Sequence, residues 1–146
     1  MNILLCTDGS EYSKKAVEQA VLIAEGCKVN EIAIIHVHDP SLETSLASYE
    51  ILTAAQMKEF QNILDNQKKE RKKILSEALK YFEEKNLKAR TILKEGHPSE
   101  TITKVAHEEG FDMIVLGSRG LGGLKKIFLG SVSNAIIQEV ENCNVL

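Results

Sequence analysis

Apolar runs and amphipathic segments alternate along the whole chain, and this alternation limits the possible folds more than any other feature. Residues 2–7, 31–39 and 111–117 are dominated by apolar side chains, as expected of strands covered on both faces of a sheet. Residues 87–96 alternate enough to form a further strand, and residues 144–146 favour a short fifth one. The segments between them repeat apolar residues with helical spacing. The order β-α-β-α-β-α-β-α-β predicts a single-domain α/β fold, an open parallel five-stranded sheet with helices on both faces.

Start and stop signals divide the helical segments. Ser10 offers an N-cap for a helix over residues 13–27, and Pro98 lies where the first turn of a later helix is expected. Gly110 suits the C-terminal end of that later helix, and Asn86 ends a long helical pattern before it. A single apolar stripe follows that long helix. Its members are Phe60, Ile63, Leu64, Ile74, Leu75, Ala78, Leu79 and Phe82.

Size and charge limit the classes of protein that the chain can be. A chain of 146 residues, 43% of them hydrophobic, suits one domain over residues 1–146 with one sizeable core. The formal net charge of −3 gives no global attraction to nucleic acid or to an anionic membrane. The basic cluster at residues 68–73 is interrupted by Glu70 and lacks aromatic residues for base stacking. We interpret it as a solvated helix face and expect no nucleic-acid partner.

Cysteine usage and the length of the apolar runs favour a cytoplasmic protein. Cys6, Cys27 and Cys143 are odd in number and widely spaced, which argues against a disulfide framework or a structural zinc site. Cys6 falls within a buried strand and is expected to be inert. The first apolar run is too short for a signal peptide, and no run approaches the ~20 residues needed to cross a bilayer. We therefore expect a reducing environment and no membrane partner.

Five of the nine glycines fall within residues 117–131, between the fourth strand and the last helix. Glycine is costly to order, so such a cluster usually marks an unusual backbone or one that something approaches closely. Gly117 ends the strand, and Gly130 and Ser131 open the helix, where free N–H groups and a partial positive charge favour an anion. These features predict a phosphate cradle, and the alternative is a flexible surface loop with a helix N-cap.

Polar side chains beside the glycines strengthen the prediction of a phosphate site. Ser131 and Ser133 can add hydroxyl donors, and Arg119, Lys125 and Lys126 can offset phosphate charge. We expect a branched side chain in place of the helix-opening glycine to project toward the phosphates and abolish binding.

The spacing of the glycines excludes two common phosphate loops. A Walker loop needs GxxxxGK[ST], but Gly117 with Gly122 is followed by Gly123 instead of lysine. A dinucleotide fingerprint needs GxGxxG, but Gly120 with Gly122 meets Lys125 at the third position. The pattern therefore indicates another class of phosphate site.

Other candidate ligands lie where strands are expected to end, the edge at which open α/β sheets bind ligands. Asp8 suits a ribose hydroxyl or Mg²⁺, and its alternative role is an Asx-type cap for the first helix. His36 and His38 share one strand face, but no third metal ligand has suitable spacing, so we interpret them as satisfied polar side chains. His97 belongs to a helix entry, and His107 to a charged, solvated helix face.

The glycine pattern resembles the signature of a known family. G-x2-G-x9-G-[ST] is met by Gly117, Gly120, Gly130 and Ser131, and it resembles the nucleotide-binding signature of the universal stress protein family. The segment ILLCTDGSEYSKKAVEQA resembles the first strand and helix of that family, and AIIHVHD resembles its second strand. The block EGHPSETITKVAHEEGFDMIVLGSRGLGGLKKIFLGSVSNAII resembles its third-helix-to-fourth-helix region. The likeness spans nearly the whole chain and is weakest over residues 40–86.

This resemblance implies an adenine nucleotide alpha hydrolase-like fold with sheet order 3-2-1-4-5 that binds ATP with Mg²⁺. It places the glycine segment on phosphate and ribose, Asp8 near the ribose and the metal ion, the backbone of Val37 at the adenine edge and Thr7 in the base pocket. Together with the basic residue above, the predicted site comprises Thr7, Asp8, Val37, Gly117, Arg119, Gly120, Gly130, Ser131, Val132 and Ser133, with Asp8 as the metal ligand.

The resemblance also implies a homodimer formed through the fifth strand, where the chain departs from the family pattern. The usual ending has Cys-Pro before a longer apolar strand, whereas here Asn144 follows Cys143 and the apolar run is short. The mode of dimerisation therefore stays open.

Three functions fit the sequence. The first is an ATP-binding, nucleotide-responsive regulatory module in stress response, which a complete cradle without an obvious general base favours. The second is a slow ATPase or autophosphorylating protein, in which Arg119, Lys125 and Lys126 stabilise a transferring phosphate. Ser131 or Ser133 would accept that phosphate. The third is a scaffold that binds another adenylate or no nucleotide. We predict a regulator rather than an efficient enzyme, and assign no catalytic residue.

Overall fold

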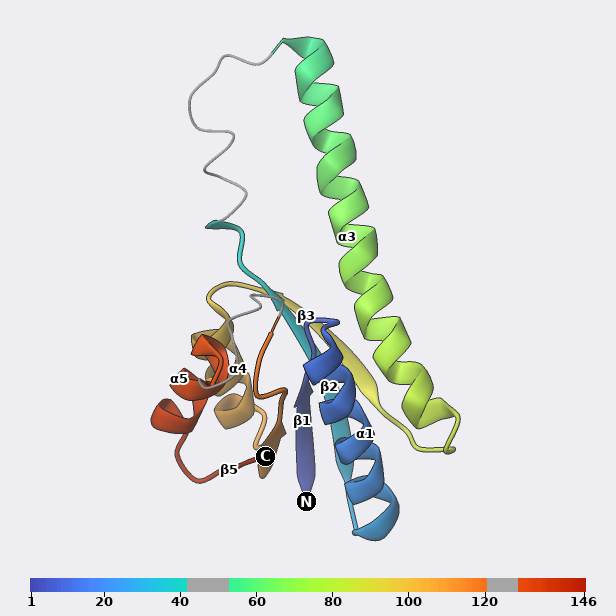
Figure 1. Ribbon diagram of the computed structural model, residues 1–146, viewed down its shortest axis with the longest axis vertical. Helices are drawn as coiled ribbons and strands as arrows, with labels where there is room; N and C mark the ends of the chain where they lie inside the picture. The colour runs from blue at the N-terminus through green and yellow to red at the C-terminus, as the bar shows by residue number, and fades with distance from the viewer. Residues whose placement is uncertain (42–52, 121–128) are drawn as a thin grey trace.

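The computed structural model describes residues 1–41, 53–120 and 129–146. Within these residues, strands and helices alternate from β1 to β5 (Figure 1), which confirms the alternation predicted from the sequence. The strands are β1 (Asn2–Cys6), β2 (Glu31–His38), β3 (Arg90–Glu95), β4 (Met113–Val115) and β5 (Asn144–Val145). The helices are α1 (Glu11–Gly26), α3 (Ala54–Glu83), α4 (Pro98–Glu108) and α5 (Ser131–Glu139).

The strands form one parallel sheet in the order β3-β2-β1-β4-β5, which confirms the order implied by the family resemblance. The central strand is β1, whose Leu4 is paired with Ala33 of β2 on one side and with Ile114 of β4 on the other. From β1 the chain builds the sheet outward to β3, and it then returns to add β4 and β5 on the other side. Connections therefore leave the carboxyl ends of β1 and β4 in opposite directions, which opens a crevice between them.

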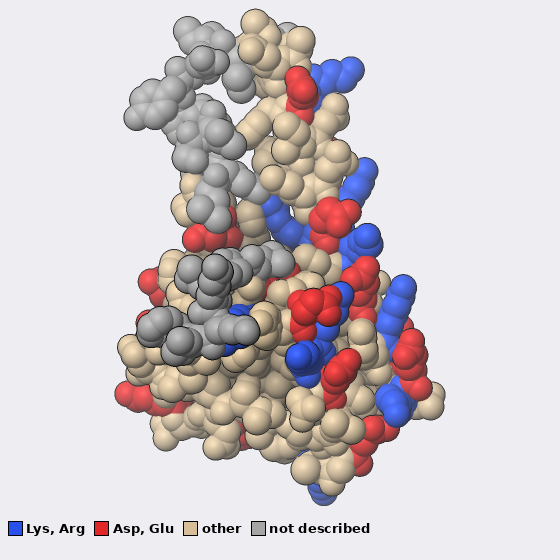
Figure 2. Space-filling model, in the orientation of Figure 1, with Lys and Arg blue, Asp and Glu red and all other residues tan. Residues whose placement is uncertain are grey.

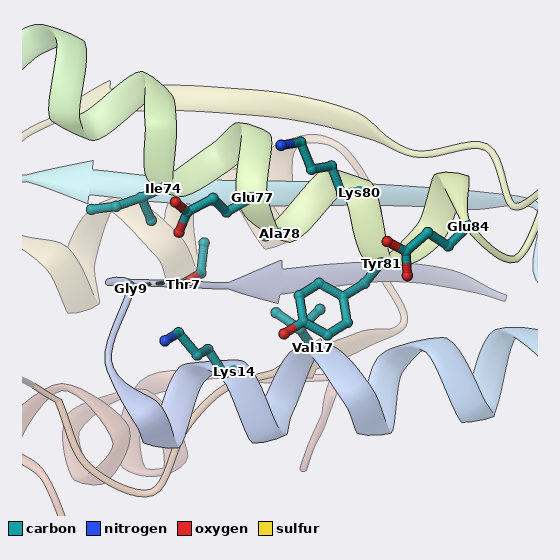
Figure 3. A pocket seen from close by; sticks show the side chains of 10 residues that line it. All are labelled: Thr7, Gly9, Lys14, Val17, Ile74, Glu77, Ala78, Lys80, Tyr81 and Glu84. Atoms are coloured by element: carbon teal, nitrogen blue, oxygen red, sulfur yellow. Dashed lines mark hydrogen bonds between the residues drawn. The ribbon is translucent and has the colours of Figure 1, made fainter.

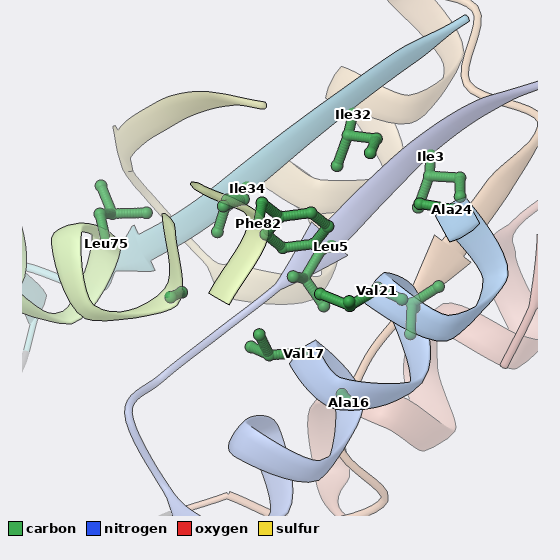
Figure 4. Packing of buried hydrophobic residues seen from close by; sticks show 13 residues of the cluster. Ile3, Leu5, Ala16, Val17, Val21, Ala24, Ile32, Ile34, Leu75 and Phe82 are labelled. Carbon is green, nitrogen blue, oxygen red and sulfur yellow. The ribbon is translucent and has the colours of Figure 1, made fainter. Parts of the chain in front are cut away.

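Helices cover both faces of the sheet, and an apolar cluster fills the space on each side. On one face, α1 and α3 pack on Ile3 and Leu5 of β1, and Phe82 of α3 points toward these strands in Figure 4. On the other face, α4 and α5 contribute to a cluster that contains Leu4 and Cys6 of the same strand. Successive residues of β1 thus enter opposite clusters, which explains why its sequence is a continuous apolar run.

The predicted helix signals act as expected. Ser10 is the N-cap of α1, and its side chain accepts a hydrogen bond from the backbone N–H three residues further on. Pro98 occupies the first turn of α4, with His97 as the N-cap, and Gly110 follows the helix with a φ of +68°. Asn86, with a φ of +57°, follows the end of α3. Local backbone chemistry therefore set these boundaries to within a few residues.

Helix α3 is 30 residues long and extends well beyond the sheet (Figure 1). Thr53 and Gln56 form a capping box at its start. Near its C-terminus Phe82 is fully buried, but Ile63 is 49% exposed and Phe60 only half-buried. The prediction of one continuous apolar stripe is therefore wrong for the N-terminal half. A 30-residue helix spans about 45 Å, whereas the eight residues of β2 span about 26 Å, so the sheet is too short to cover the helix.

Charged side chains of both signs are interspersed on the face of the molecule drawn in Figure 2. The basic cluster at residues 68–73 lies on α3, and all of it except the half-buried Arg71 is exposed, which confirms a solvated helix face. His107 is also exposed, as predicted. None of the described helices combines the length and the apolar composition that a bilayer crossing requires.

Candidate functional site

A cavity of about 350 Å³ opens at the carboxyl ends of the central strands, where the topology predicts a crevice. The ends of β1 and β2 form its inner wall, and the first turn of α4 forms one side. Residues 116–120, which follow β4, and residues 129–133, at the start of α5, form the remaining walls. These five segments of the chain therefore meet around one space.

The cavity brings together every residue that the sequence predicted for the site. These are Thr7, Asp8, Val37, Gly117, Arg119, Gly120, Gly130, Ser131, Val132 and Ser133. Their part in binding stays a prediction, but their convergence is a fact of the fold. The lining residues that the sequence prediction missed are Cys6, Ser13, Ile35, Pro98, Ile102, Leu116 and Leu129. The strand period of two could have found Ile35 beside Val37, whereas the two α4 residues needed the packed structure.

Helix α5 begins at the cavity without a side-chain cap. Its N-cap is Gly130, which has no side chain to accept a bond from the first turn, and the Gly130 N–H donates to the Ser118 carbonyl oxygen at 2.8 Å. The amides of Ser131, Val132 and Ser133 precede the first i→i−4 bond of the helix and lie at the positive end of its dipole. Because all three residues line the cavity, this helix end is suited to an anion held there.

The hydroxyl group of Ser133 is used inside the protein. Ser133 is 3% exposed, and its Oγ donates to the carbonyl oxygens of Gly130 at 3.0 Å and Ser118 at 3.3 Å. A hydroxyl has one hydrogen, so in this geometry none is left to donate to a ligand. Ser133 therefore offers the cavity its amide N–H, while Ser131 is exposed at the rim.

Asp8 divides two roles between its carboxylate oxygens. Oδ1 accepts a hydrogen bond from the Ser10 N–H at 3.0 Å, which confirms the Asx-type role at the start of α1. Oδ2 borders the glycine loop, because a Cβ built on Gly120 would lie 2.6 Å from it. Within the described ranges no three His, Cys, Asp or Glu side chains gather as metal ligands. One carboxylate still fits Mg²⁺, which commonly takes its other ligands from phosphates and water.

Gly117 and Gly130 are needed for the loop to pack against its own chain. A Cβ on Gly117 would lie 2.8 Å from the carbonyl carbon of Tyr12 and 2.9 Å from the amide nitrogen of Ser13. A Cβ on Gly130 would lie 3.3 Å from the Cα of Arg119. A side chain at Gly130 would therefore press on the loop at Arg119, and its predicted projection toward the phosphates stays a prediction.

Arg119 joins the glycine loop to α1. Its Nη1 donates to the Tyr12 hydroxyl at 3.0 Å, and its guanidinium carbon lies 5.3 Å from the centre of the Tyr12 ring. Arg119 also lines the cavity, where a guanidinium group favours phosphate oxygens. Lys125 and Lys126, which were predicted to offset phosphate charge, lie outside the described residues.

The inner end of the cavity combines apolar side chains with open backbone groups. The Thr7 N–H donates to the Ile35 carbonyl oxygen at 3.0 Å, where the pairing of β1 with β2 ends. Val37 follows two residues later, so its N–H and C=O point to the same side as those of Ile35, past the end of β1. Ile102 and Leu116 add apolar surface. An apolar slot bordered by backbone N–H and C=O groups at one edge suits a purine base.

His36 and Cys6, beside the inner wall, have the roles predicted for them: His36 is hydrogen-bonded and Cys6 is buried and unreactive. The His36 ring lies with Nδ1 2.8 Å from the Thr7 carbonyl oxygen, so Nδ1–H donates to the end of β1. Burial raises the pKa of the Cys6 thiol well above its usual range, and Cys143 adds to the shift. Both residues therefore support the shape of the wall rather than its reactivity.

A second cavity of about 400 Å³ lies on the opposite face of the sheet, between α1 and α3. Figure 3 shows Lys14 reaching into it from α1, opposite Glu77 of α3. Thr7 lines this cavity as well as the first one. Glu77 and Glu84 place carboxylates along its wall beside Lys14 and Lys80, so the wall has no net positive charge, and α1 and α3 contribute their sides rather than a helix start such as that of α5. The second cavity is therefore the poorer match for an anionic ligand.

Comparison with known proteins agrees with the likeness seen in the sequence. The model of the Universal stress protein family matches residues 1–146. Universal stress protein YxiE of Bacillus subtilis is 37% identical, over 99% of this chain and 95% of that protein. Universal stress protein MJ0577 of Methanocaldococcus jannaschii is 33% identical, over 94% and 88%. The solved structure of MJ0577 covers 99% of this chain and 94% of its own, with a TM-score of 0.78 and 31% identity. The chain therefore belongs to the universal stress protein family.

Two more distant solved structures hold adenine nucleotides. One is a universal stress protein in complex with cAMP, which has a TM-score of 0.62 and 21% identity over 100% of this chain and 94% of that one. The other is a family protein from Arabidopsis thaliana with AMP bound, with a TM-score of 0.60 and 17% identity over 100% and 89%. At these identities the likeness is one of fold.

Proposed function

We propose that the cavity between β1 and β4 binds an adenine nucleotide, ATP with Mg²⁺, and that the protein is a nucleotide-responsive regulatory module in stress response. One observation carries the proposal: the uncapped amides of α5, the guanidinium of Arg119 and the carboxylate of Asp8 surround a single cavity with an apolar inner end. The nucleotides in the cAMP and AMP complexes of related proteins support the same ligand class.

Each part of a nucleotide has a matching wall in this proposal. The base lies in the apolar slot, where the backbone of Val37 can bond its edge. The phosphates lie at the start of α5, where the amides and Arg119 favour negative charge. Asp8 holds a ribose hydroxyl or contributes one oxygen to Mg²⁺, and the metal ion would offset phosphate charge when bound.

Binding at this place can act as a signal because the walls belong to separate elements. A ligand that contacts the β1 end, the loop after β4 and the start of α5 favours the conformations in which all three are correctly placed. The stability gained grows with ligand concentration as RT ln(1 + [L]/Kd). The nucleotide would therefore shift the population of a surface that protein partners recognise.

A second candidate is a site for a nucleotide with a single phosphate. The cAMP and AMP complexes of family members favour it, since both ligands carry one phosphate. The same walls serve this candidate, which differs in how far the ligand extends along α5.

Isothermal titration calorimetry of the purified chain with Mg-ATP, ADP, AMP, cAMP and GTP tests the proposal. We expect the adenine nucleotides to bind and GTP to bind more weakly, because the slot is apolar with one hydrogen-bonding edge. Asp8→Asn should weaken Mg-ATP binding, whereas the control Glu77→Gln in the second cavity should leave it unchanged. Absence of both heat and a thermal shift at millimolar ATP would refute the proposal. Binding of AMP or cAMP in clear preference to ATP would favour the second candidate.

A homodimer in the cytoplasm remains our expectation for the assembly. The strand through which the family resemblance implies dimerisation, β5, is two residues long here and pairs with β4. Backbone pairing between two such short strands forms few hydrogen bonds, so side-chain contacts would have to supply most of the interface. Sedimentation velocity over a range of concentrations measures the assembly directly.

A further inference from the structure

We propose that Tyr12 is a positioning residue, which holds the Arg119 guanidinium at the wall of the cavity and so sets how strongly the site prefers ligands with a phosphate chain. The inference rests on the proposed nucleotide function and extends it to a residue outside the predicted site. Tyr12 is not among the residues that line the cavity, and the glycine signature does not include it.

Two contacts fix the guanidinium group against the tyrosine. The hydrogen bond from Nη1 of Arg119 to the Tyr12 hydroxyl, at 3.0 Å, fixes the far end of the arginine side chain. The guanidinium carbon lies 5.3 Å from the ring centre, within the range of a cation–π contact. The hydroxyl and the ring therefore make separable contributions, which different substitutions can remove one at a time.

The backbones that carry these two side chains are pressed together. Tyr12 is the second residue of α1, whose start is fixed by the Ser10 cap. The loop that carries Arg119 begins at Gly117, where a Cβ would lie 2.8 Å from the Tyr12 carbonyl carbon. The same close contact thus places both partners, so their meeting follows from the fold rather than from a chance approach of two long side chains.

The backbone of Arg119 lies beside the start of α5, and Arg119 lines the same cavity as the first turn of that helix. The Cα of Arg119 is 3.3 Å from a Cβ built on Gly130, the N-cap of that helix, and the Gly130 N–H bonds the preceding loop at Ser118. An arginine side chain has many rotamers, so a ligand that must immobilise it loses affinity through the side-chain entropy that is lost. Tyr12 orders this arginine before a ligand arrives, so the gain from the phosphate charge is larger.

A double-mutant cycle on the full chain tests the inference. The dissociation constant for Mg-ATP is measured by calorimetry for wild type, Tyr12→Leu, Tyr12→Phe, Arg119→Gln and the Tyr12→Leu/Arg119→Gln double variant. The affinity for adenosine is measured by its displacement of a fluorescent ATP analogue from each of these proteins. Tyr81→Leu is the matched control, because Tyr12 and Tyr81 are each 37% exposed and Tyr81 lines the second cavity. Circular dichroism and thermal melting confirm that each variant is folded.

We expect Tyr12→Leu to raise the Kd for ATP about fivefold to tenfold, as loss of one hydrogen bond and one ring contact to a cation implies. Tyr12→Phe should have a smaller effect, since it keeps the ring. On the Arg119→Gln background Tyr12→Leu should change nothing further. Adenosine affinity should be the same in all variants, and the Tyr81→Leu control should match wild type for both ligands.

The outcomes separate this inference from the function on which it rests. Wild-type protein that fails to bind ATP overturns both. Wild type that binds ATP while Tyr12→Leu has no effect overturns the role of Tyr12 alone. The role is also overturned if the effects of Tyr12→Leu and Arg119→Gln on the Kd for ATP add in full. It is likewise overturned if Tyr12→Leu weakens the affinity for adenosine as much as that for ATP, because either result indicates a general structural role.

Discussion

The two cavities differ in what their walls are made of, although they have similar volumes, about 350 Å³ and 400 Å³, and share Thr7. The first lies at the ends of strands and helices, where backbone N–H and C=O groups have no partner within their own element. The second lies between the sides of α1 and α3, where the backbone is used in helical hydrogen bonds and side chains alone face the space. A site for phosphate depends on this difference more than on volume.

The charges of the side chains are balanced in both cavities, so the backbone amides make the difference. The described wall of the first cavity carries one carboxylate, Asp8, and one guanidinium, Arg119. The second mixes Lys14 and Lys80 with Glu77 and Glu84. Mixed side chains suit a solvated surface, whereas fixed amides cost no reorganisation when an anion binds. Four predictions test this comparison, and we take them from the largest expected effect to the smallest.

The largest expected difference is in the loss of protein stability when a glycine at each cavity is replaced by alanine. We expect Gly117→Ala to lower the free energy of unfolding by about 3 kcal/mol, since the new Cβ meets backbone that cannot move aside. Gly9→Ala, at the second cavity, should cost about 1–2 kcal/mol, because its φ is +79° and the near contact is the movable Ile74 side chain at 3.1 Å. Urea unfolding measures both. Gly26→Ala, with nothing within 4 Å, is the control. Equal losses at the first two positions would contradict the distinction.

Gly120 should affect binding more than stability. A Cβ at this position would lie 2.6 Å from Oδ2 of Asp8, a side-chain atom that can turn away. Gly120→Ala should therefore move the carboxylate and raise the Kd for Mg-ATP about tenfold, which corresponds to ~1.4 kcal/mol. Calorimetry at high and low Mg²⁺ measures the change. A Kd equal to that of wild type would show that the carboxylate does not serve the ligand.

The buried thiol at the inner wall of the first cavity should make stability depend on alkaline pH. Burial raises the pKa of Cys6 above its ordinary value of 9.0, so above that pH the unfolded chain loses a proton that the folded chain keeps. Stability should then fall as pH rises, by up to about 1.4 kcal/mol per pH unit from this group. Cys6→Ala should remove that part of the slope, and exposed Cys27→Ala should not. Identical slopes in denaturant titrations at pH 8–10.5 would argue against a closed inner wall.

Substitution of Thr7, which lines both cavities, should have the smallest effect. The Thr7 hydroxyl donates to the Ser13 hydroxyl at 3.2 Å and accepts from the Gly9 N–H at 3.3 Å. Thr7→Val keeps the shape and removes both bonds, so we expect a loss of about 1 kcal/mol in stability. ATP affinity should change by less than about threefold, since a ligand there meets mainly backbone. A change in ATP affinity larger than that of Gly120→Ala would mean that the two cavities are more strongly coupled than the geometry implies.

The candidate site shows how far local patterns reach. The ends of β1 and β4 could be placed from the sequence because each strand is a short apolar run followed by a polar or glycine residue, as at Asp8 and Gly117. The start of α5 could be placed for the same reason. The roles of the glycines could not, because the atoms nearest to Gly117 belong to Tyr12, more than a hundred residues away in the chain.

The long helix shows the opposite limit. Its apolar spacing at Phe60 and Ile63 is as regular as at Leu75 and Phe82, so the sequence predicted one stripe. Burial differs along the helix because the sheet beneath it ends. The sequence of the helix does not indicate where the sheet ends.

The order of strands and helices, their caps and the edge of the sheet that would hold a ligand were determined by the sequence alone, because periodicity, capping and turn chemistry act between residues close together in the chain. The meeting of Pro98 and Ile102 with the glycine loop, the pairing of Tyr12 with Arg119 and the extent of α3 that is buried were decided only by tertiary structure. These features depend on strand register, sheet size and the close approach of distant backbones, which exist only once the chain is packed.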